Sequence, residues 1–256
     1  MSRTAGIDVG SITAKAAVMG DGVLLGTRVI FTGYNSEAAG RRVFDELLGE
    51  LGLGRTGIDR VVATGYGRKS VATADKAVTE IMCHAAGAHF LDPSIRSVID
   101  IGGQDSKAIA MGENGRLLNF AMNDKCAAGT GRFHEVMARA LEADLDAFGE
   151  LSIRAKKPAR ISNLCTVFAE SEVISLIAKG EKRENIIAGI HEAIASRIAA
   201  MASRIGLAEP VMMTGGVARN LGVVRALEKA IGMQVVVSPH AQVNGAIGAA
   251  AIARDV

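Results

Sequence analysis

The chain is poor in residues on which several classes of protein depend. Its 256 residues include no tryptophan, and aromatic residues make up only 4%. We therefore expect an aliphatic core and no stacking platform for single-stranded nucleic acid. The net charge is only +2, and no basic block occurs along the sequence. A nucleic-acid partner is excluded on this basis, since it would require a concentrated positive surface.

Long apolar runs are also absent. No stretch of 18 apolar residues occurs, so we expect no membrane-spanning helix. The first residues fit a strand, so we expect no signal peptide. Three cysteines are too few for a disulfide framework. Together these features predict a cytoplasmic protein with no membrane partner.

The chain does contain an internal repeat. Residues 7–22 (IDVGSITAKAAVMGDG) align without a gap with residues 99–114 (IDIGGQDSKAIAMGEN). A repeat at this separation is too long for a solenoid and suggests two related half-domains. In each copy an apolar strand ends in Asp-x-Gly, a turn of small residues follows, and a second strand begins at a lysine. The identical pairs are Ile7/Ile99, Asp8/Asp100, Gly10/Gly102, Lys15/Lys107, Ala16/Ala108, Met19/Met111 and Gly20/Gly112.

The repeated turn has the composition of a phosphate-binding turn. Glycine lets a phosphate approach the backbone N–H groups closely, and a nearby carboxylate can hold Mg²⁺ through water. Two ordinary β-hairpins with the same turn are the alternative, but hairpin stability requires neither the paired aspartates nor the paired lysines. Two such turns facing each other would hold one nucleotide polyphosphate between two lobes.

Apolar periodicity predicts alternating strands and helices along the whole chain. Strands are expected within 5–31 and 97–122 and at 59–64, 210–214 and 234–237. Helices are expected at 36–51 (with Ser36 as N-cap), 79–91, 130–143, 168–178, 184–205, 219–231 and 243–253. Between strand 210–214 and the next helix lies a third glycine turn, Thr214-Gly215-Gly216. Alone it is a weak signal, because such joints are common.

The order of these three turns resembles the phosphate-1, phosphate-2 and adenosine elements of acetate kinase, sugar kinases, Hsp70 and actin. This resemblance implies an α/β, two-lobed ribonuclease-H-like ATPase fold, with mixed sheets flanked by helices and ATP in the cleft. The lobes would comprise residues 1–95 and 96–256, and helix 243–256 is expected to pack on the first lobe.

The same resemblance assigns the nucleotide-binding residues. Those around the phosphates would be Gly10, Ser11, Thr13 and Lys15 on one side and Gly102, Gly103, Gln104 and Lys107 on the other. Gly215, Gly216 and Val217 would meet the adenosine. Asp8 and Asp100 would organise Mg²⁺ and water. Gln104 or Asp105 could orient the attacking water, and the sequence does not choose between them.

The cysteines suggest a second function. Cys126 and Cys165 both precede predicted helices, and helix N-termini favour a thiolate or an anionic cluster. Two thiols cannot complete a four-thiolate site, but a two-fold dimer would supply four. Two buried structural thiols are the alternative. Cys83 lies within a predicted helix and is expected to be a core residue.

Four segments, ATGYGR, NDKCAAGTGRF, CTVFAESEVIS and IAGIH, resemble the activator components of 2-hydroxyacyl-CoA dehydratases. That family includes the ATPase subunits of benzoyl-CoA reductase, and the resemblance runs from residue 6 to about residue 250. It implies one oxygen-sensitive [4Fe–4S] cluster that bridges a homodimer through Cys126 and Cys165. It also implies that ATP drives a low-potential electron from ferredoxin or flavodoxin into a partner iron–sulfur enzyme.

The sequence leaves several partners and activities open. The partner would be a 2-hydroxyacyl-CoA dehydratase, with another double-cubane-cluster protein or a benzoyl-CoA reductase as alternatives. Outside redox chemistry, a small-molecule (sugar) kinase or a non-redox ATPase scaffold would use the same fold. Within the redox hypothesis, the helix that begins after Gly129 is expected to couple ATP turnover to the cluster.

Overall fold

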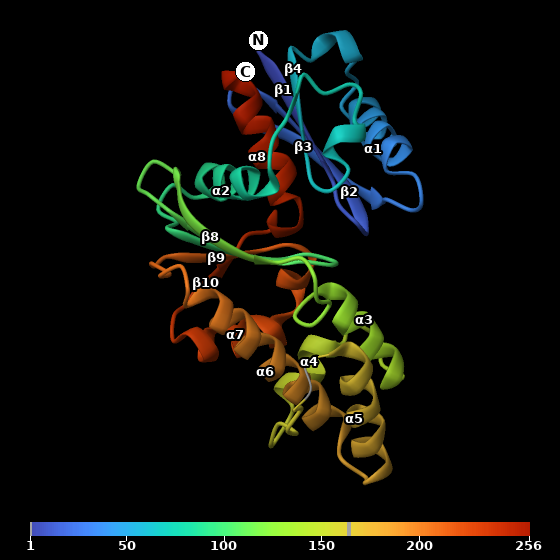
Figure 1. Ribbon diagram of the computed structural model, residues 1–256. Helices are drawn as coiled ribbons and strands as arrows, with labels where there is room; N and C mark the ends of the chain where they lie inside the picture. Colours follow the sequence, from blue (N-terminus) through green and yellow to red (C-terminus); the bar gives the residue numbers. More distant parts are fainter. Residues whose placement is uncertain (1, 163–164) are drawn as a thin grey trace. The chain divides into compact units, whose positions relative to one another are not determined.

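A computed structural model describes residues 2–162 and 165–256 and divides the chain into two compact units (Figure 1). Unit 1 comprises residues 1–98, 111–118 and 238–256, and unit 2 comprises residues 99–110 and 119–237. No helix within the described ranges is both long enough and apolar enough to span a bilayer.

Unit 1 is built on a five-stranded sheet in the order β3-β2-β1-β4-β5. β1 (Arg3–Val9), β2 (Thr13–Gly20) and β3 (Val23–Phe31) form an antiparallel meander, and β4 (Arg60–Thr64) and β5 (Lys76–Ala77) extend it in parallel. Asp21 and Gly22, between β2 and β3, both have left-handed backbone conformations (φ 49° and 83°). This is the turn that an Asp-Gly pair favours.

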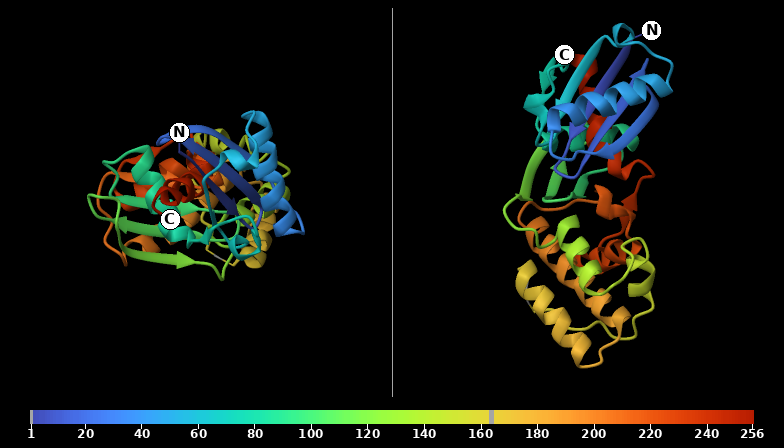
Figure 2. Two further views of the ribbon diagram at one scale, coloured as in Figure 1. Left: turned by 90° about the horizontal axis from the view of Figure 1, so that it is seen from above. Right: turned by 90° about the vertical axis from the view of Figure 1, so that its right-hand side faces the viewer.

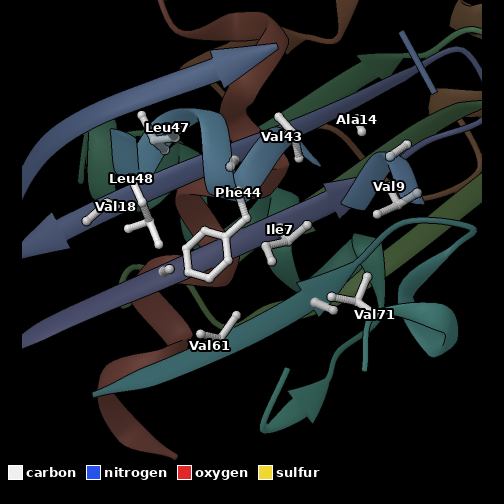
Figure 3. Close-up of a cluster of buried hydrophobic side chains, with 14 residues drawn as sticks. Ile7, Val9, Ala14, Val18, Val43, Phe44, Leu47, Leu48, Val61 and Val71 are labelled. Atoms are coloured by element: carbon white, nitrogen blue, oxygen red, sulfur yellow. The ribbon is translucent and has the colours of Figure 1, made fainter. Parts of the chain in front are cut away.

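Helices cover both faces of this sheet. α1 (Ser36–Glu50) packs on one face, where Phe44 and Val43 meet Ile7 and Val9 (Figure 3). Side chains alternate along a strand, so Gly6 faces the other side. There a Cβ on Gly6 would collide with the backbone of α8 (Asn244–Ile252). Only glycine permits this approach, which places α8 against β1, with α2 (Glu80–Leu91) packed on α8.

The start of α1 differs from the prediction. Asn35, and not Ser36, is the N-cap, since its side chain accepts a hydrogen bond from the Ala38 N–H at 2.9 Å. Ser36 is the first helical residue, and its hydroxyl lies 3.3 Å from that of Ser70. Asparagine and serine are about equally good caps, so the sequence pattern alone could not separate the two neighbours.

The second sheet also has five strands, in the order β10-β9-β6-β7-β8. They are β6 (Ser97–Ile101), β7 (Ser106–Met111), β8 (Leu117–Asn123), β9 (Val211–Thr214) and β10 (Val235–Val237). Every residue of β6, β7 and β9 is buried, as expected of strands covered on both faces.

Unit 2 carries a helical layer in addition to its strands. The helices are α3 (Gly131–Ala140), α4 (Phe148–Ile153), α5 (Thr166–Ala178), α6 (Arg183–Ala202) and α7 (Leu221–Ile231). α4, α6 and α7 pack together, and α5 contacts α3 and α6 (Figure 2). α4 was not predicted, because six residues are too few for an apolar period to be visible. The predicted helix 219–231 is in fact a 3₁₀ turn at Gly216–Arg219 followed by α7.

Candidate functional site

The first copy of the repeat forms a hairpin with a partly buried ion pair. Asp8 and Lys15 are direct partners in the β1–β2 register, and the lysine Nζ lies 3.2 Å from the Asp8 Oδ2. The turn between the strands is closed by the Gly10 N–H, which donates to the Thr13 carbonyl at 3.1 Å. Ser11 lies half-buried within this turn. Unit 1 thus brings together all five site residues that the sequence predicts for it.

The second copy contains a denser charge cluster. The Lys107 Nζ lies 3.2 Å from the Asp100 Oδ2 and 2.8 Å from the Asp105 Oδ2. The Lys107 side chain is only 1% exposed, and both carboxylates are buried. The turn is closed by the Gly102 N–H, which donates to the Asp105 carbonyl at 2.9 Å. Gly103 and Gln104 lie in this turn, and Gln104 is exposed.

The third glycine turn lies against the second repeat. The Thr214 hydroxyl donates to the Asp100 Oδ1 at 2.8 Å. Gly215 has a positive φ of 87°, and a Cβ there would collide with the Ile101 carbonyl. Gly216 and Val217 follow in the 3₁₀ turn. Unit 2 therefore brings its predicted phosphate and adenosine residues into one neighbourhood, at the ends of adjacent strands β6 and β9.

The glycine turn of the second repeat, at Gly102 and Gly103, is hydrogen-bonded to α3. The Gly131 N–H donates to the Gly102 carbonyl, and the Arg132 N–H donates to the Gly103 carbonyl, both at 2.9 Å. The first amides of a helix have no partner within the helix, and here two of them are satisfied by the glycine turn. These two hydrogen bonds join the backbone of Gly102 and Gly103 directly to the start of α3.

The two predicted ligand cysteines lie in unit 2 next to helices. Cys126 is half-buried in the segment before α3, and the Asn123 side chain donates to its carbonyl at 2.7 Å. Cys165 is exposed and is the N-cap residue of α5. The third cysteine, Cys83, is buried, and burial raises the pKa of its thiol to about 12. Cys83 is thus a poor ligand, because a metal is bound by the thiolate.

The chemistry of two of the cysteines fits the ligand set that the sequence predicts for an iron–sulfur cluster. Accessible thiolates are the ligands of such clusters, and Cys126 and Cys165 are the accessible cysteines. In the described ranges no three histidine, cysteine or carboxylate side chains group closely enough to hold a metal ion. Two thiols are half of the ligands that a four-thiolate site requires.

Thr214 and Asn123 are missing from the predicted site residues. Thr214 could have been found, since it directly precedes Gly215 and Gly216 at the end of a predicted strand. Asn123 offers no such signal, because its side chain reaches Cys126 only through the local fold of the segment.

The structure contains a repeated Asp–turn–Lys hairpin followed by a Gly-Gly turn, on two mixed sheets flanked by helices, which is the arrangement that the sequence predicts for an ATPase. The model of the BadF/BadG/BcrA/BcrD ATPase family matches residues 5–253. The chain belongs to this family, and the fold class predicted from the sequence is confirmed.

Several of the similar proteins are named as activators of dehydratases. The chain is 50% identical to the activator of lactoyl-CoA dehydratase from Anaerotignum propionicum, over 98% of this chain and 97% of that protein. The crystal structure of component A of the Acidaminococcus fermentans (R)-2-hydroxyglutaryl-CoA dehydratase covers 100% of this chain and 98% of its own, with a TM-score of 0.96 and 46% identity. The activator of the 2-hydroxyisocaproyl-CoA dehydratase from Clostridium difficile with bound ADPNP covers 99% and 94%, with a TM-score of 0.93 and 46% identity.

Proposed function

We propose that the protein is an ATP-dependent activator that delivers a low-potential electron to a partner iron–sulfur enzyme, a 2-hydroxyacyl-CoA dehydratase. The names of the similar proteins support the dehydratase as partner. The electron donor would be a reduced ferredoxin or flavodoxin. The similar activator with bound ADPNP supports ATP as the nucleotide.

The two repeats would divide the work on Mg-ATP. Lys15, at the Gly10–Thr13 turn of unit 1, would neutralise phosphate charge. Asp100, in the buried cluster of unit 2, would hold Mg²⁺ through water, and Asp8 would act in the same way beside Lys15. Phosphoryl transfer of this kind requires positioning and charge stabilisation but no covalent nucleophile.

Gln104 is the better candidate to orient the attacking water. The Asp105 carboxylate is buried and held by Lys107 at 2.8 Å, so it cannot turn toward a ligand without breaking that pair. The Gln104 side chain is exposed at the same turn, and its amide can both donate to and accept from a water molecule.

One observation supports the proposed coupling of ATP turnover to electron transfer. The carbonyls of Gly102 and Gly103 accept the first amides of α3, and Cys126 lies just before that helix. Loss of the γ-phosphate would relax the glycine turn, tilt the start of α3 and move the segment that holds Cys126. Gly129, with a φ of 84°, supplies the joint.

A homodimer would bring Cys126 and Cys165 together with their copies. The cluster, when bound, supplies one-electron redox chemistry. α5 follows directly after its N-cap residue Cys165 and exposes an apolar stripe, with Val167 67% and Phe168 62% exposed, continued by Ile174 and Ile177. Such a stripe beside a ligand cysteine is typical of a protein interface, and a two-fold axis there would juxtapose the two Cys165 residues.

Anaerobic purification tests this proposal. We expect a brown dimer with roughly two iron atoms per chain, one four-iron cluster being shared by two chains. Cys126→Ala and Cys165→Ala should each lose all iron and the visible absorption, whereas the matched control Cys83→Ala should keep both. A colourless protein that phosphorylates a sugar would instead support a kinase. Loss of iron in Cys83→Ala with retention in either of the other variants would overturn the ligand assignment.

A further inference from the structure

The first turn of α5 is not capped by the side chain at its N-cap position. Cys165 occupies that position, and its thiol makes no capping hydrogen bond in the described part of the chain. Serine, threonine, aspartate and asparagine are the side chains that normally cap a helix, and cysteine is not among them. The start of α5 therefore depends on other contacts, and the Cys165 thiol remains available as a ligand.

Glu172 supplies such a contact from within the same helix. Both of its carboxylate oxygens accept from the Ser162 N–H at 3.0 Å, and the Ser162 hydroxyl donates to the Oε1 at 2.8 Å. Hydrogen bonds to a carboxylate are about twice as strong as those between neutral groups. Ser162 stands three positions before Cys165, so these bonds, the Ser162–Glu172 clasp, tie the segment that enters α5 back to the helix.

The clasp lies on the same side of α5 as the predicted ligand. Glu172 and Cys165 are seven positions apart, which is about two turns of a helix, so they point in nearly the same direction. Ala169 and Val173, on the adjoining face, are fully buried. Glu172 is half-buried and Cys165 is exposed. The clasp therefore joins the segment before an exposed ligand to the packed part of the helix.

The segment of the other predicted ligand is held by a different chemical group. The Asn123 side chain donates to the Cys126 carbonyl at 2.7 Å and to the Ala128 carbonyl at 3.4 Å. An amide donor thus holds the backbone near Cys126, and a carboxylate acceptor holds the backbone before Cys165. Removal of a group that holds a metal ligand in place commonly costs about 10–100-fold in metal affinity.

We propose that Glu172 is a positioning residue of the cluster, which through the clasp holds the backbone that presents the Cys165 thiolate. The inference rests on the proposed function, because it takes Cys165 as a ligand. Glu172 is not itself a ligand, since the clusters are held by thiolates and its carboxylate binds Ser162. Loss of the clasp frees the segment before Cys165, and the cluster then loses iron more readily.

Hydrogen exchange followed by mass spectrometry, on the protein as purified, tests the clasp whether or not a cluster is bound. We expect the peptide that contains Ser162 to exchange at least about tenfold faster in Glu172→Gln, because a neutral amide is a weaker acceptor than a carboxylate. Glu170→Gln, which removes the same charge two residues earlier on α5, is the matched control and should follow the parent. Equal exchange in Glu172→Gln and the parent would overturn the proposal.

The anaerobic protein with its cluster tests the positioning role. Bathophenanthroline disulfonate should remove iron about tenfold faster from Glu172→Gln than from Glu170→Gln, and only the first variant should change the electron paramagnetic resonance spectrum of the reduced cluster. Ser162→Thr keeps both donors and should follow the parent, whereas Ser162→Ala, which loses the hydroxyl, should lose iron at an intermediate rate. This order separates positioning from a general loss of stability.

The outcomes also separate this inference from the proposed function. A parent protein that binds no iron would overturn the proposed function and this inference with it. An iron-loaded parent, with equal rates of iron removal in Glu172→Gln and Glu170→Gln, would overturn this inference alone.

Discussion

The two copies of the repeat share a fold but differ in how they hold their lysine. Lys15 has one carboxylate partner, Asp8, and its side chain is 15% exposed. Lys107 has two, Asp100 and Asp105, and is 1% exposed. A single sequence difference accounts for this, since Asp105 stands where the first copy has Thr13.

This difference would let the two copies take different roles at the proposed nucleotide site. The pair in unit 1 is neutral, and its lysine is near enough to solvent to turn toward a phosphate. The cluster in unit 2 has two negative charges and one positive charge, a balance that suits Mg²⁺. The locked lysine would then act as a support for the carboxylates, and the partly exposed lysine would meet the ligand.

Removal of each lysine should produce the largest contrast. Lys107→Met leaves two buried carboxylates without their cation, and we expect it to lower the free energy of unfolding by about 3–5 kcal/mol. Lys15→Met leaves the single buried Asp8 carboxylate without its cation and should cost less, about 1–3 kcal/mol. Urea unfolding followed by circular dichroism measures both. Equal losses would show that the two lysines have the same role.

The turn of the second copy should be the more sensitive to bulk. Gly103→Val places a branched side chain where a phosphate must approach the backbone, and we expect the affinity for Mg-ATP to fall at least about tenfold, or 1.4 kcal/mol. Gly54→Val, at an exposed loop position where a Cβ would meet only the Thr56 hydroxyl, at 3.8 Å, is the matched control. Titration calorimetry with ADPNP that shows unchanged affinity in Gly103→Val would remove this turn from the phosphate site.

Acid should expose a further difference between the units. In unit 1, the Asn244 amide donates to the His84 carbonyl at 2.9 Å and lies 3.2 Å from its Nδ1. In unit 2, the His134 ring has no side-chain hydrogen-bond partner among the described residues, and burial lowers its pKa from 6.5 to about 4 against a smaller opposing effect of the Thr130 backbone. The pKa of His134 is lower in the folded chain than in the unfolded chain. The contribution of the neutral His134 ring to the free energy of unfolding is therefore fully present above pH 6.5 and is lost as the pH falls toward 4.

Each pH unit within that window should cost about 1.4 kcal/mol for this histidine. We expect His134→Phe to lose less stability than the parent chain between pH 7.5 and 5.5, by about 1 kcal/mol. His240→Gln is the control and should follow the parent. The same slope in all three proteins would mean that His134 does not titrate in this range.

Much of the site could be predicted from the sequence because it depends on local patterns. The Asp8–Lys15 and Asp100–Lys107 pairs follow from strand register, and Gly215 follows from its place between a strand and a helix. The second partner of Lys107 could not be inferred from the repeat, because Asp105 has no counterpart in the first copy. The choice of Gln104 over Asp105 required burial, which the sequence does not display.

Other features depend on contacts between distant segments. The bonds from Gly131 and Arg132 to the glycine turn join residues about thirty positions apart, and no periodicity reports them. A pocket lined by His191 arises where α4, α6 and α7 meet, and α4 is too short to be seen in the sequence. Gly6 shows the reverse case, since a glycine within a strand signals a close approach without saying which helix makes it.

The central claim is that the state of the nucleotide changes the surroundings of the cluster through Gly129 and α3. The most direct test is the rate at which bathophenanthroline disulfonate removes iron anaerobically, with and without Mg-ATP. We expect Mg-ATP to accelerate iron removal several-fold in the parent. Gly129→Ala, strained at its positive φ of 84°, should lose this dependence while still binding ADPNP, and Gly206→Ala, at a φ of 69° with no neighbour within 4 Å, should retain it. Iron removal at the same rate with and without nucleotide in the parent protein would contradict the account.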